Sequence, residues 1–177
     1  MNILTIHVIG TPAPQGSKRA FVVNGKAVLA ESSKKVKPWR QDVKSAVEDL
    51  ASDGLVRSLE QLPLTGPLEV SIDFYLPRPG YHFRTGKHAG ELKDNAPAYV
   101  DKKPDVDKLL RSTLDGLKEA GVYRDDAQVA IATGVKHYAN AATGARIAVR
   151  PLIASPAADS PAAAGEVLNQ RQEVLFP

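Results

Sequence analysis

The sequence contains no cysteine, a single methionine and a single tryptophan among its 177 residues. The absence of cysteine excludes a disulfide scaffold, a thiolate zinc site and a cysteine nucleophile, and it agrees with a reducing, cytoplasmic location. No stretch approaches the roughly 20 apolar residues of a membrane span. The first ten residues, MNILTIHVIG, have neither the basic region nor the long apolar run of a secretory signal. We therefore expect neither secretion nor membrane insertion.

The composition is that of a globular chain, with 43% hydrophobic and 24% charged residues. Its length suits one domain that buries a core without disulfides. The net charge is only +3, but Gly16 to Arg40 holds one acid, Glu31, and seven basic residues: Lys18, Arg19, Lys26, Lys34, Lys35, Lys37 and Arg40. Such a run suits a polyanion, and it is equally typical of a solvated lysine-rich loop.

Hydrophobic periodicity predicts an α+β fold, with two main helices and a mixed β-sheet in a single domain of residues 1–150. The strand patterns mostly alternate, which implies one open face and disfavours a doubly wound parallel sheet. In chain order we expect a strand at 2–9, a hairpin around Asn24-Gly25, a helix over about 36–51, a strand at 68–76, a helix at 105–120, and strands at 128–138 and 146–150.

The same patterns assign faces to the elements. Trp39 lies on the apolar face of the first helix, where core packing suits it better than stacking on bases. For the second helix we expect a buried stripe of Val106, Leu110, Leu114 and Leu117, with Thr113 beside it and Gly121 as the cap. For the strand at 128–138 we expect Val129, Ile131 and Val135 to share one face.

Two segments lack a regular period. Residues 80–103 are rich in Gly, His and basic residues, and we expect a long functional loop there. Within it, Tyr81 is a candidate to stack on exposed bases, and His82 and His88 are expected to be exposed to solvent. Residues 151–177 are rich in Ala, Pro and Ser and predict a flexible tail.

The most informative segment runs from Lys103 to Lys136 and holds five aspartates: Asp105, Asp107, Asp115, Asp125 and Asp126. Residues two apart in a helix point about 200° away from each other. Pro104 favours an extended residue before it, which places Asp105 just before the first turn, where it can face the same space as Asp107. A simpler interpretation makes Asp105 a helix cap and the Asp125-Asp126 pair a turn. The spacing alone does not bring Asp126 to Asp105, so both interpretations stay open.

If these carboxylates meet, they suit a hard cation with oxygen ligands, Mg²⁺ or Mn²⁺. Such ions activate water and neutralise the charge that builds up on a phosphodiester. Arg111 lies one turn after Asp107 on the same helix face, where it can hold a scissile phosphate or stabilise transition-state charge. The alternative is a surface salt bridge between the two, which would contribute little.

The segment from Pro104 to Val129, PDVDKLLRSTLDGLKEAGVYRDDAQV, resembles the signature of the RusA-like Holliday junction resolvases, endonucleases of bacteria and their prophages. The family pattern is D-x-D-N-L-x-K, a leucine-rich helix with an internal Asp, and then G-[VF]-[WY]-x-D-D-x-Q-V. Weaker similarity extends to the opening strand, to the turn Gly10–Arg19 and to Lys136. The resemblance covers residues 1–150 and leaves out the tail.

The resemblance implies a homodimer that binds four-way DNA junctions and nicks them symmetrically with Mg²⁺, or Mn²⁺, in recombination and repair. By position, the metal-binding carboxylates are Asp105, Asp107 and Asp126. Arg111 stands where the family has a catalytic lysine, and arginine keeps the charge but donates no proton at neutral pH. We expect the DNA-binding residues to be Lys18, Arg19, Lys102, Lys103, Lys108 and Lys136. Lys108 replaces the family asparagine, and Asp125 is assigned no role.

Two rival functions share parts of this pattern. A metal-dependent transferase also uses D-x-D, but the sequence lacks a Gly-rich phosphate loop. A DNA-binding module with weak or no catalysis is supported only by the arginine at position 111. Symmetric cutting needs two sites related by a two-fold axis, so we expect a dimer. In that dimer, the opening strand and the strand at 68–76 would offer sheet edges to a second copy.

Overall fold

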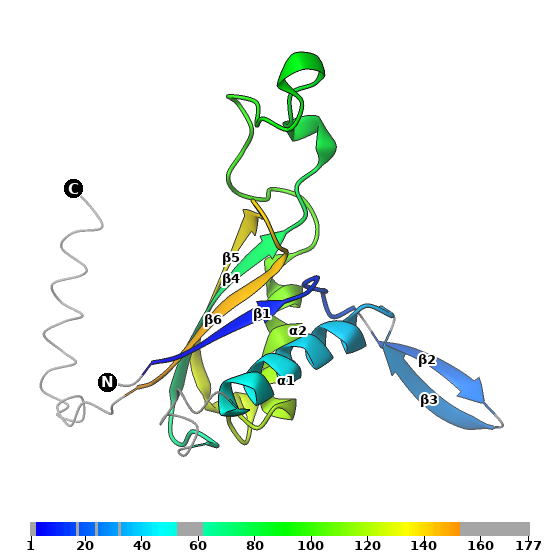
Figure 1. Ribbon diagram of the computed structural model, residues 1–177. Coiled ribbons are helices and arrows are strands. Elements are labelled where there is room, and N and C mark those ends of the chain that lie inside the picture. Colours follow the sequence, from blue (N-terminus) through cyan, green and yellow to red (C-terminus); the bar gives the residue numbers. More distant parts are fainter. Residues whose placement is uncertain (1–2, 17, 24, 32, 53–61, 153–177) are drawn as a thin grey trace, which may run out of the picture.

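The computed structural model describes residues 3–16, 18–23, 25–31, 33–52 and 62–152, and it shows a four-stranded sheet with two helices packed on one face (Figure 1). No helix in these ranges is long and apolar enough to cross a membrane. The elements are β1 (Leu4–Ile9), β2 (Lys18–Val23), β3 (Lys26–Glu31), α1 (Val36–Ser52), β4 (Leu68–Leu76), α2 (Val106–Glu119), β5 (Val129–Tyr138) and β6 (Gly144–Pro151), with short 3₁₀ turns η2 (Gly80–His82), η3 (Gly86–His88) and η4 (Asp126–Gln128).

The sheet is mixed, which confirms the predicted α+β class. Its strand order is β1-β6-β4-β5, and only the β4–β5 pair is parallel. The chain reaches β5 from β4 through α2, as a parallel connection requires. The expectation that the strand at 68–76 leaves an open edge is wrong, because β6 and β5 pair with its two sides. The edges of the described sheet are β1, as expected, and β5.

The core lies between the sheet and the two helices. The alternation expected of the strands is confirmed in β1 and β4, since alternate residues of both are buried under the helices. Trp39 of α1 is fully buried and its Nε1 donates a hydrogen bond to Thr113 Oγ1 of α2 at 3.0 Å. At Gly116 of α2, an added Cβ would lie 3.3 Å from Val43 Cβ. Glycine there lets the two helices approach closely.

The predicted stripe of α2 is only partly right. Thr113 and Leu117 are buried, together with Leu109, Ser112 and Gly116, whereas Val106, Leu110 and Leu114 are half-buried. The helix turns its buried face toward α1 and lays the half-buried residues over β5. There, a Cβ added at Gly134 would lie 2.9 Å from Val106 and 3.0 Å from Leu110. As expected, Gly121 follows the helix with a φ of 77°.

Two further expectations are corrected. The register of β5 shifts at its start, so Val129 pairs with Leu68 on the helix side while Ile131 pairs with Glu69 on the open side, 46% exposed. Val129, Ile131 and Val135 therefore do not share one face. His82 is buried at 6% exposure, because Tyr81 and Tyr138 pack edge-on against its ring at 4.6 and 4.8 Å.

Two projections extend from the body of the fold (Figure 1). The β2–β3 hairpin, predicted from Asn24-Gly25, pairs Val23 with Lys26 across its turn. The segment between β4 and α2 forms the other projection and contains η2 and η3. His88 is exposed there, as expected, and contacts Glu91 at 3.2 Å. The predicted tail lies outside the described residues from position 153 on.

Candidate functional site

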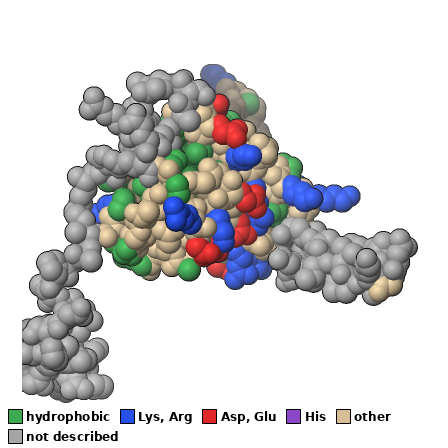
Figure 2. All heavy atoms as spheres, turned by 90° about the horizontal axis from the view of Figure 1, so that it is seen from below, with side chains coloured by type: hydrophobic (Ala, Val, Ile, Leu, Met, Phe, Trp, Pro, Cys, Tyr) green, Lys and Arg blue, Asp and Glu red, His purple; other side chains and the backbone are tan. Residues whose placement is uncertain are grey.

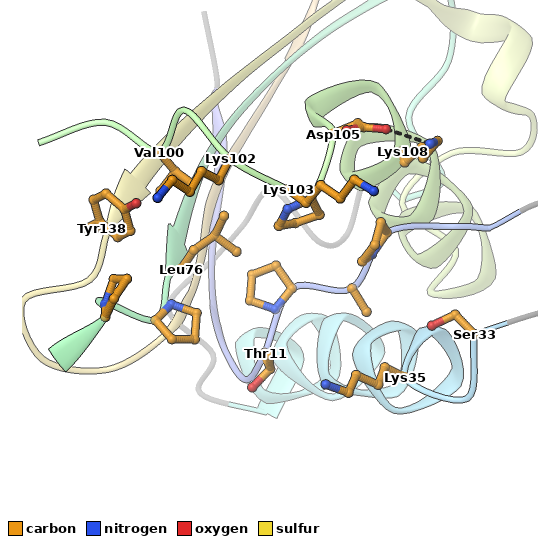
Figure 3. Close-up of a pocket in the computed structure, with 16 residues that line it drawn as sticks. Thr11, Ser33, Lys35, Leu76, Val100, Lys102, Lys103, Asp105, Lys108 and Tyr138 are labelled. Atoms are coloured by element: carbon orange, nitrogen blue, oxygen red, sulfur yellow. Dashed lines mark hydrogen bonds and ion pairs between the residues drawn. The ribbon is translucent and has the colours of Figure 1, made fainter. Parts of the chain in front are cut away.

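The start of α2 positions the first aspartate of the pattern. Asp105 occupies the N-cap, just before the first turn as expected, with an extended backbone of φ −70° and ψ 137°. Its carboxylate turns to Lys108, whose Nζ donates a hydrogen bond at 2.5 Å (Figure 3). That bond, with the charge of the same lysine, lowers the pKa of Asp105 below its ordinary value. The carboxylate is therefore ionised at neutral pH and already partly neutralised by a cation.

Lys136 of β5 fixes the segment that leads into α2. Its Nζ donates to the backbone carbonyls of Lys102, at 2.8 Å, and Pro104, at 2.9 Å. The backbone N–H of Val100 in turn donates to the carbonyl of Lys136 at 3.1 Å. Two of the three ammonium protons are thus used inside the protein, so the structure gives Lys136 a positioning role. The sequence pattern named this lysine only as a DNA contact.

A hollow beside α2 gathers three of the acids. It is lined by Asp107, Asp115 and Asp126, by Arg111, and by an apolar floor of Leu110, Leu114, Val129 and Ala132, and its volume is about 330 Å³. We call it the acidic hollow. Residues 107, 111 and 115 follow at intervals of four, which places them on one helix face. The turn into β5 supplies Asp126 from the other side.

The charged groups of the acidic hollow differ in how they are paired. Asp115 accepts a hydrogen bond from Arg40 Nη2 of α1, and Asp126 accepts one from Lys118 Nζ at 3.3 Å. The bond to Asp126 raises the pKa of Lys118. Asp107 and Arg111 are exposed, and within the described residues neither forms a hydrogen bond or an ion pair, not even with the other. The hollow therefore holds one carboxylate and one guanidinium that are open to a ligand.

Asp125 has a structural task that explains its place in the pair. Its carboxylate accepts a hydrogen bond from the N–H of Ala127 at 2.9 Å, and the Gln128 side chain accepts one from the N–H of Asp125 at 3.2 Å. This capping box begins η4, and the bond from Ala127 lowers the pKa of Asp125. The turn interpretation thus holds for Asp125, while Asp126 lines the acidic hollow.

The expected common space for Asp105 and Asp107 is not seen. Asp105 lines a separate pocket, larger than the acidic hollow, and its carboxylate is hydrogen-bonded by Lys108, three residues further along the helix. Asp107 lines the acidic hollow. Among the described residues, no group of three or more acidic or histidine side chains is arranged to hold a metal ion. Mg²⁺, however, is commonly bound through one or two carboxylates, with water and substrate phosphate completing its shell. Asp107 and Asp126, which both line the acidic hollow, carry carboxylate oxygens, the donor type that Mg²⁺ prefers.

Three of the basic residues named as DNA contacts, Lys102, Lys103 and Lys108, line the pocket at the start of α2. Lys102 donates to the Tyr81 hydroxyl at 3.0 Å, and its ammonium lies 5.3 Å from the centre of that ring. Lys103 is exposed. Lys18 and Arg19 begin β2, and their contact with DNA stays a prediction. On the face seen from below, acidic and basic side chains are interspersed (Figure 2). On that face, the described side chains do not separate by charge into broad patches.

Comparison with known proteins identifies the chain at the family level. A curated protein of Bacillus subtilis (strain 168), named "Uncharacterized protein YqaN", is 26% identical over 129 residues, which cover 73% of this chain and 83% of that relative. Residues 10–150 match the family described as Endodeoxyribonuclease RusA, a range that includes both helices and every acid considered above. The chain therefore belongs to the RusA endodeoxyribonuclease family, as the resemblance of its acidic segment predicted.

Proposed function

We propose that this protein nicks four-way DNA junctions in a reaction that depends on Mg²⁺ or Mn²⁺, and that it acts in DNA recombination and repair. The observation that carries the proposal is the acidic hollow, which lies within the matched family region and holds a carboxylate and a guanidinium that form no hydrogen bond or ion pair with any described residue. A carboxylate that can bind a metal ion and a guanidinium that can bind a phosphate suit phosphodiester cleavage, since both the metal and the cation must act on the same scissile phosphate.

Asp107 and Asp126 are the proposed metal ligands in the acidic hollow, and Asp105 is the third carboxylate, contributed from the adjacent pocket. A bound divalent ion supplies an activated water and neutralises charge on the phosphodiester. Arg111 binds the non-bridging oxygens of the scissile phosphate, and its charge offsets the negative charge that grows as water attacks. Because arginine stays protonated, the leaving oxygen takes its proton from water.

DNA is held by the basic residues around the start of α2. Lys102, Lys103 and Lys108 supply direct phosphate contacts, and Lys18 and Arg19 supply more from the hairpin. Lys136 acts by holding the backbone that carries Lys102 and Pro104. The protein works as a two-fold dimer, since one chain offers one acidic hollow while a symmetric junction needs two cuts. Removal of the residues after Pro151 is expected to leave the dimer intact by light scattering.

The decisive experiment uses the full chain with a synthetic four-way junction and a linear duplex of the same sequence. We expect Mg²⁺-dependent nicks at symmetric positions of the junction, little cutting of the duplex and no cutting in EDTA. Binding to the junction without nicks in any divalent metal would support the DNA-binding module instead. Failure to bind either DNA would favour the D-x-D transferase.

A further inference from the structure

A second recess lies on the other side of the α2 start and has a different chemistry. It opens between the segment that follows β1, the beginning of α1 and the segment from β4 to α2, and its volume is about 650 Å³. Four lysines line it: Lys35, Lys102, Lys103 and Lys108. We call it the lysine-rimmed pocket.

The wall of this pocket is apolar and firmly held. Five prolines contribute to it, together with Leu76, Val100 and Tyr138. Tyr138 is 6% exposed, with Arg78 at 4.9 Å from the centre of its ring and His82 packed edge-on at 4.8 Å. Proline and tyrosine rings lose little freedom when a ligand packs against them, so the wall is preorganised for a flat apolar group.

The charge of the pocket favours an anion. Asp105 is the one acid among its described lining residues, and Lys108 already pairs with it. Lys35 approaches from the side of α1, while Lys102 and Lys103 lie on the opposite wall (Figure 3). Positive charge is therefore supplied to the pocket from two sides, although Lys102 also donates a hydrogen bond to the Tyr81 hydroxyl, at 3.0 Å.

We propose that the lysine-rimmed pocket binds one unpaired nucleotide of the DNA substrate, with its base against the apolar wall and its phosphate on the lysines. This inference rests on the proposed function and adds to it a binding site for a single base. Stacking of a base on an aromatic side chain such as Tyr138 tolerates any sequence, because every base has a π-face. The volume lies within the usual range of about 300–1,000 Å³ for small-ligand sites.

A nucleotide bound in this pocket would position the neighbouring phosphodiester of the DNA. Asp105 lines this pocket and Asp107 lines the acidic hollow, and only one residue separates them in the chain. A nucleotide seated among the lysines would leave its neighbouring phosphodiester at the first turn of α2, beside Asp107. The free N–H groups of a helix start carry partial positive charge that favours a phosphate there. Binding of an unstacked base in the lysine-rimmed pocket would thus determine which phosphate of the DNA enters the acidic hollow.

The test measures binding of deoxyadenosine 5′-monophosphate to the full, metal-free chain by NMR titration, with deoxyribose 5-phosphate and inorganic phosphate as the comparison ligands. We expect the nucleotide to bind about tenfold more tightly than deoxyribose 5-phosphate, which corresponds to the stacking of one base. Equal affinities of the nucleotide and the sugar phosphate would overturn the proposal.

Two variants locate the binding. Ser33→Trp fills the mouth of the pocket and is expected to abolish nucleotide binding, and Lys35→Ala is expected to weaken it several-fold. Lys37→Ala is the matched control, because this exposed lysine lies two residues further on, in the first turn of α1, and lines a different recess. An equal loss in Lys35→Ala and Lys37→Ala would contradict the assignment.

The outcomes for the wild-type protein separate this proposal from the proposed function. Nicking of junctions without base-dependent binding would overturn only the nucleotide-binding proposal. Binding of the nucleotide without any nicking would overturn only the proposed function.

Discussion

The two recesses beside the start of α2 differ in the state of their charges. In the acidic hollow, Asp107 and Arg111 form no hydrogen bond or ion pair with any described residue, while the other two acids are paired with basic side chains. In the lysine-rimmed pocket, the one described acid is paired with Lys108, Lys102 donates to the Tyr81 hydroxyl, and Lys35 and Lys103 also line the pocket. The acidic hollow thus presents a carboxylate and a guanidinium, whereas the lysine-rimmed pocket presents mainly lysines beside an apolar wall.

This difference arises from a single short pattern. In this D-x-D, Asp105 sits at the N-cap with its carboxylate hydrogen-bonded by Lys108, whereas Asp107 lies in the first turn of α2 and lines the acidic hollow. Asp105 joins the lysines and Asp107 joins the acids. We infer a division of labour, in which the lysine-rimmed pocket holds DNA and the acidic hollow cuts it. The predictions below test that division, beginning with the largest effect.

Arg111 is expected to matter for rate more than for binding. Arg111→Ala should slow single-turnover nicking of a junction by about 10²–10³-fold, the usual effect of removing one transition-state contact. Arg111→Lys restores the family residue and should keep most of the rate. Nicking by the alanine variant at the wild-type rate would remove Arg111 from the site.

Lys136 is expected to matter for the structure of the lysine-rimmed pocket. Lys136→Ala leaves the carbonyls of Lys102 and Pro104 without their donor and should lower the free energy of unfolding by about 1–2 kcal/mol in urea titrations. Lys93→Ala, an exposed lysine of the neighbouring loop, should change it by less than about 0.5 kcal/mol. Equal effects of the two substitutions would contradict the positioning role.

The lysines of the pocket are expected to set the salt dependence of DNA binding. Replacing Lys102 and Lys103 together by alanine should flatten the slope of log affinity against log salt by about one to two units, one for each lost phosphate contact. Fluorescence anisotropy with a labelled junction measures this slope. An unchanged slope would place the DNA elsewhere on the molecule.

The smallest effect lies on the open face of the sheet, away from both recesses. Partial burial raises the pKa of Asp73, but its hydrogen bonds with His137, at 3.0 Å, and Arg146, at 2.9 Å, outweigh burial and lower it. The stabilisation is therefore present above the unfolded pKa of about 3.9 and is lost as pH falls through the lower folded value.

Asp73→Asn should accordingly cost less than about 1 kcal/mol at pH 7, and the difference from wild type should shrink at pH 3. Urea unfolding at the two pH values measures it, and nicking activity should stay at the wild-type rate. A difference that grows in acid would reverse the sign of this account.

The sequence was sufficient to predict features that depend on local signals, namely hydrophobic periodicity and turn-forming dipeptides. The alternation in β4, the apolar face of α1 around Trp39 and the turn at Asn24-Gly25 predicted the elements that the structure contains. A register shift has no signature in the period, which is why Ile131 was assigned to the same face as Val129. His82 is buried by Tyr138, a residue far away in the chain, and local sequence does not report such contacts.

The functional site could likewise be predicted only as far as local sequence allows. Spacing identified the acids and the arginine, and the family pattern gave their order. The sequence did not show that Lys108 holds the Asp105 carboxylate, that Asp125 caps η4, or that Lys136 binds backbone carbonyls. Each of these depends on a side-chain hydrogen bond whose geometry is set only when the elements pack.

The central claim is tested most directly by measuring binding and nicking of the same junction by Asp107→Asn, with Asp49→Asn as the control. Asp49 is an exposed acid of α1 that lines neither recess. We predict that Asp107→Asn binds the junction at least as well as wild type, since a negative charge near phosphate is removed, and nicks it at least about a thousandfold more slowly in Mg²⁺. Asp49→Asn should match wild type in both. Wild-type nicking by Asp107→Asn, or a parallel loss of binding and nicking, would contradict the division between a cutting hollow and a binding pocket.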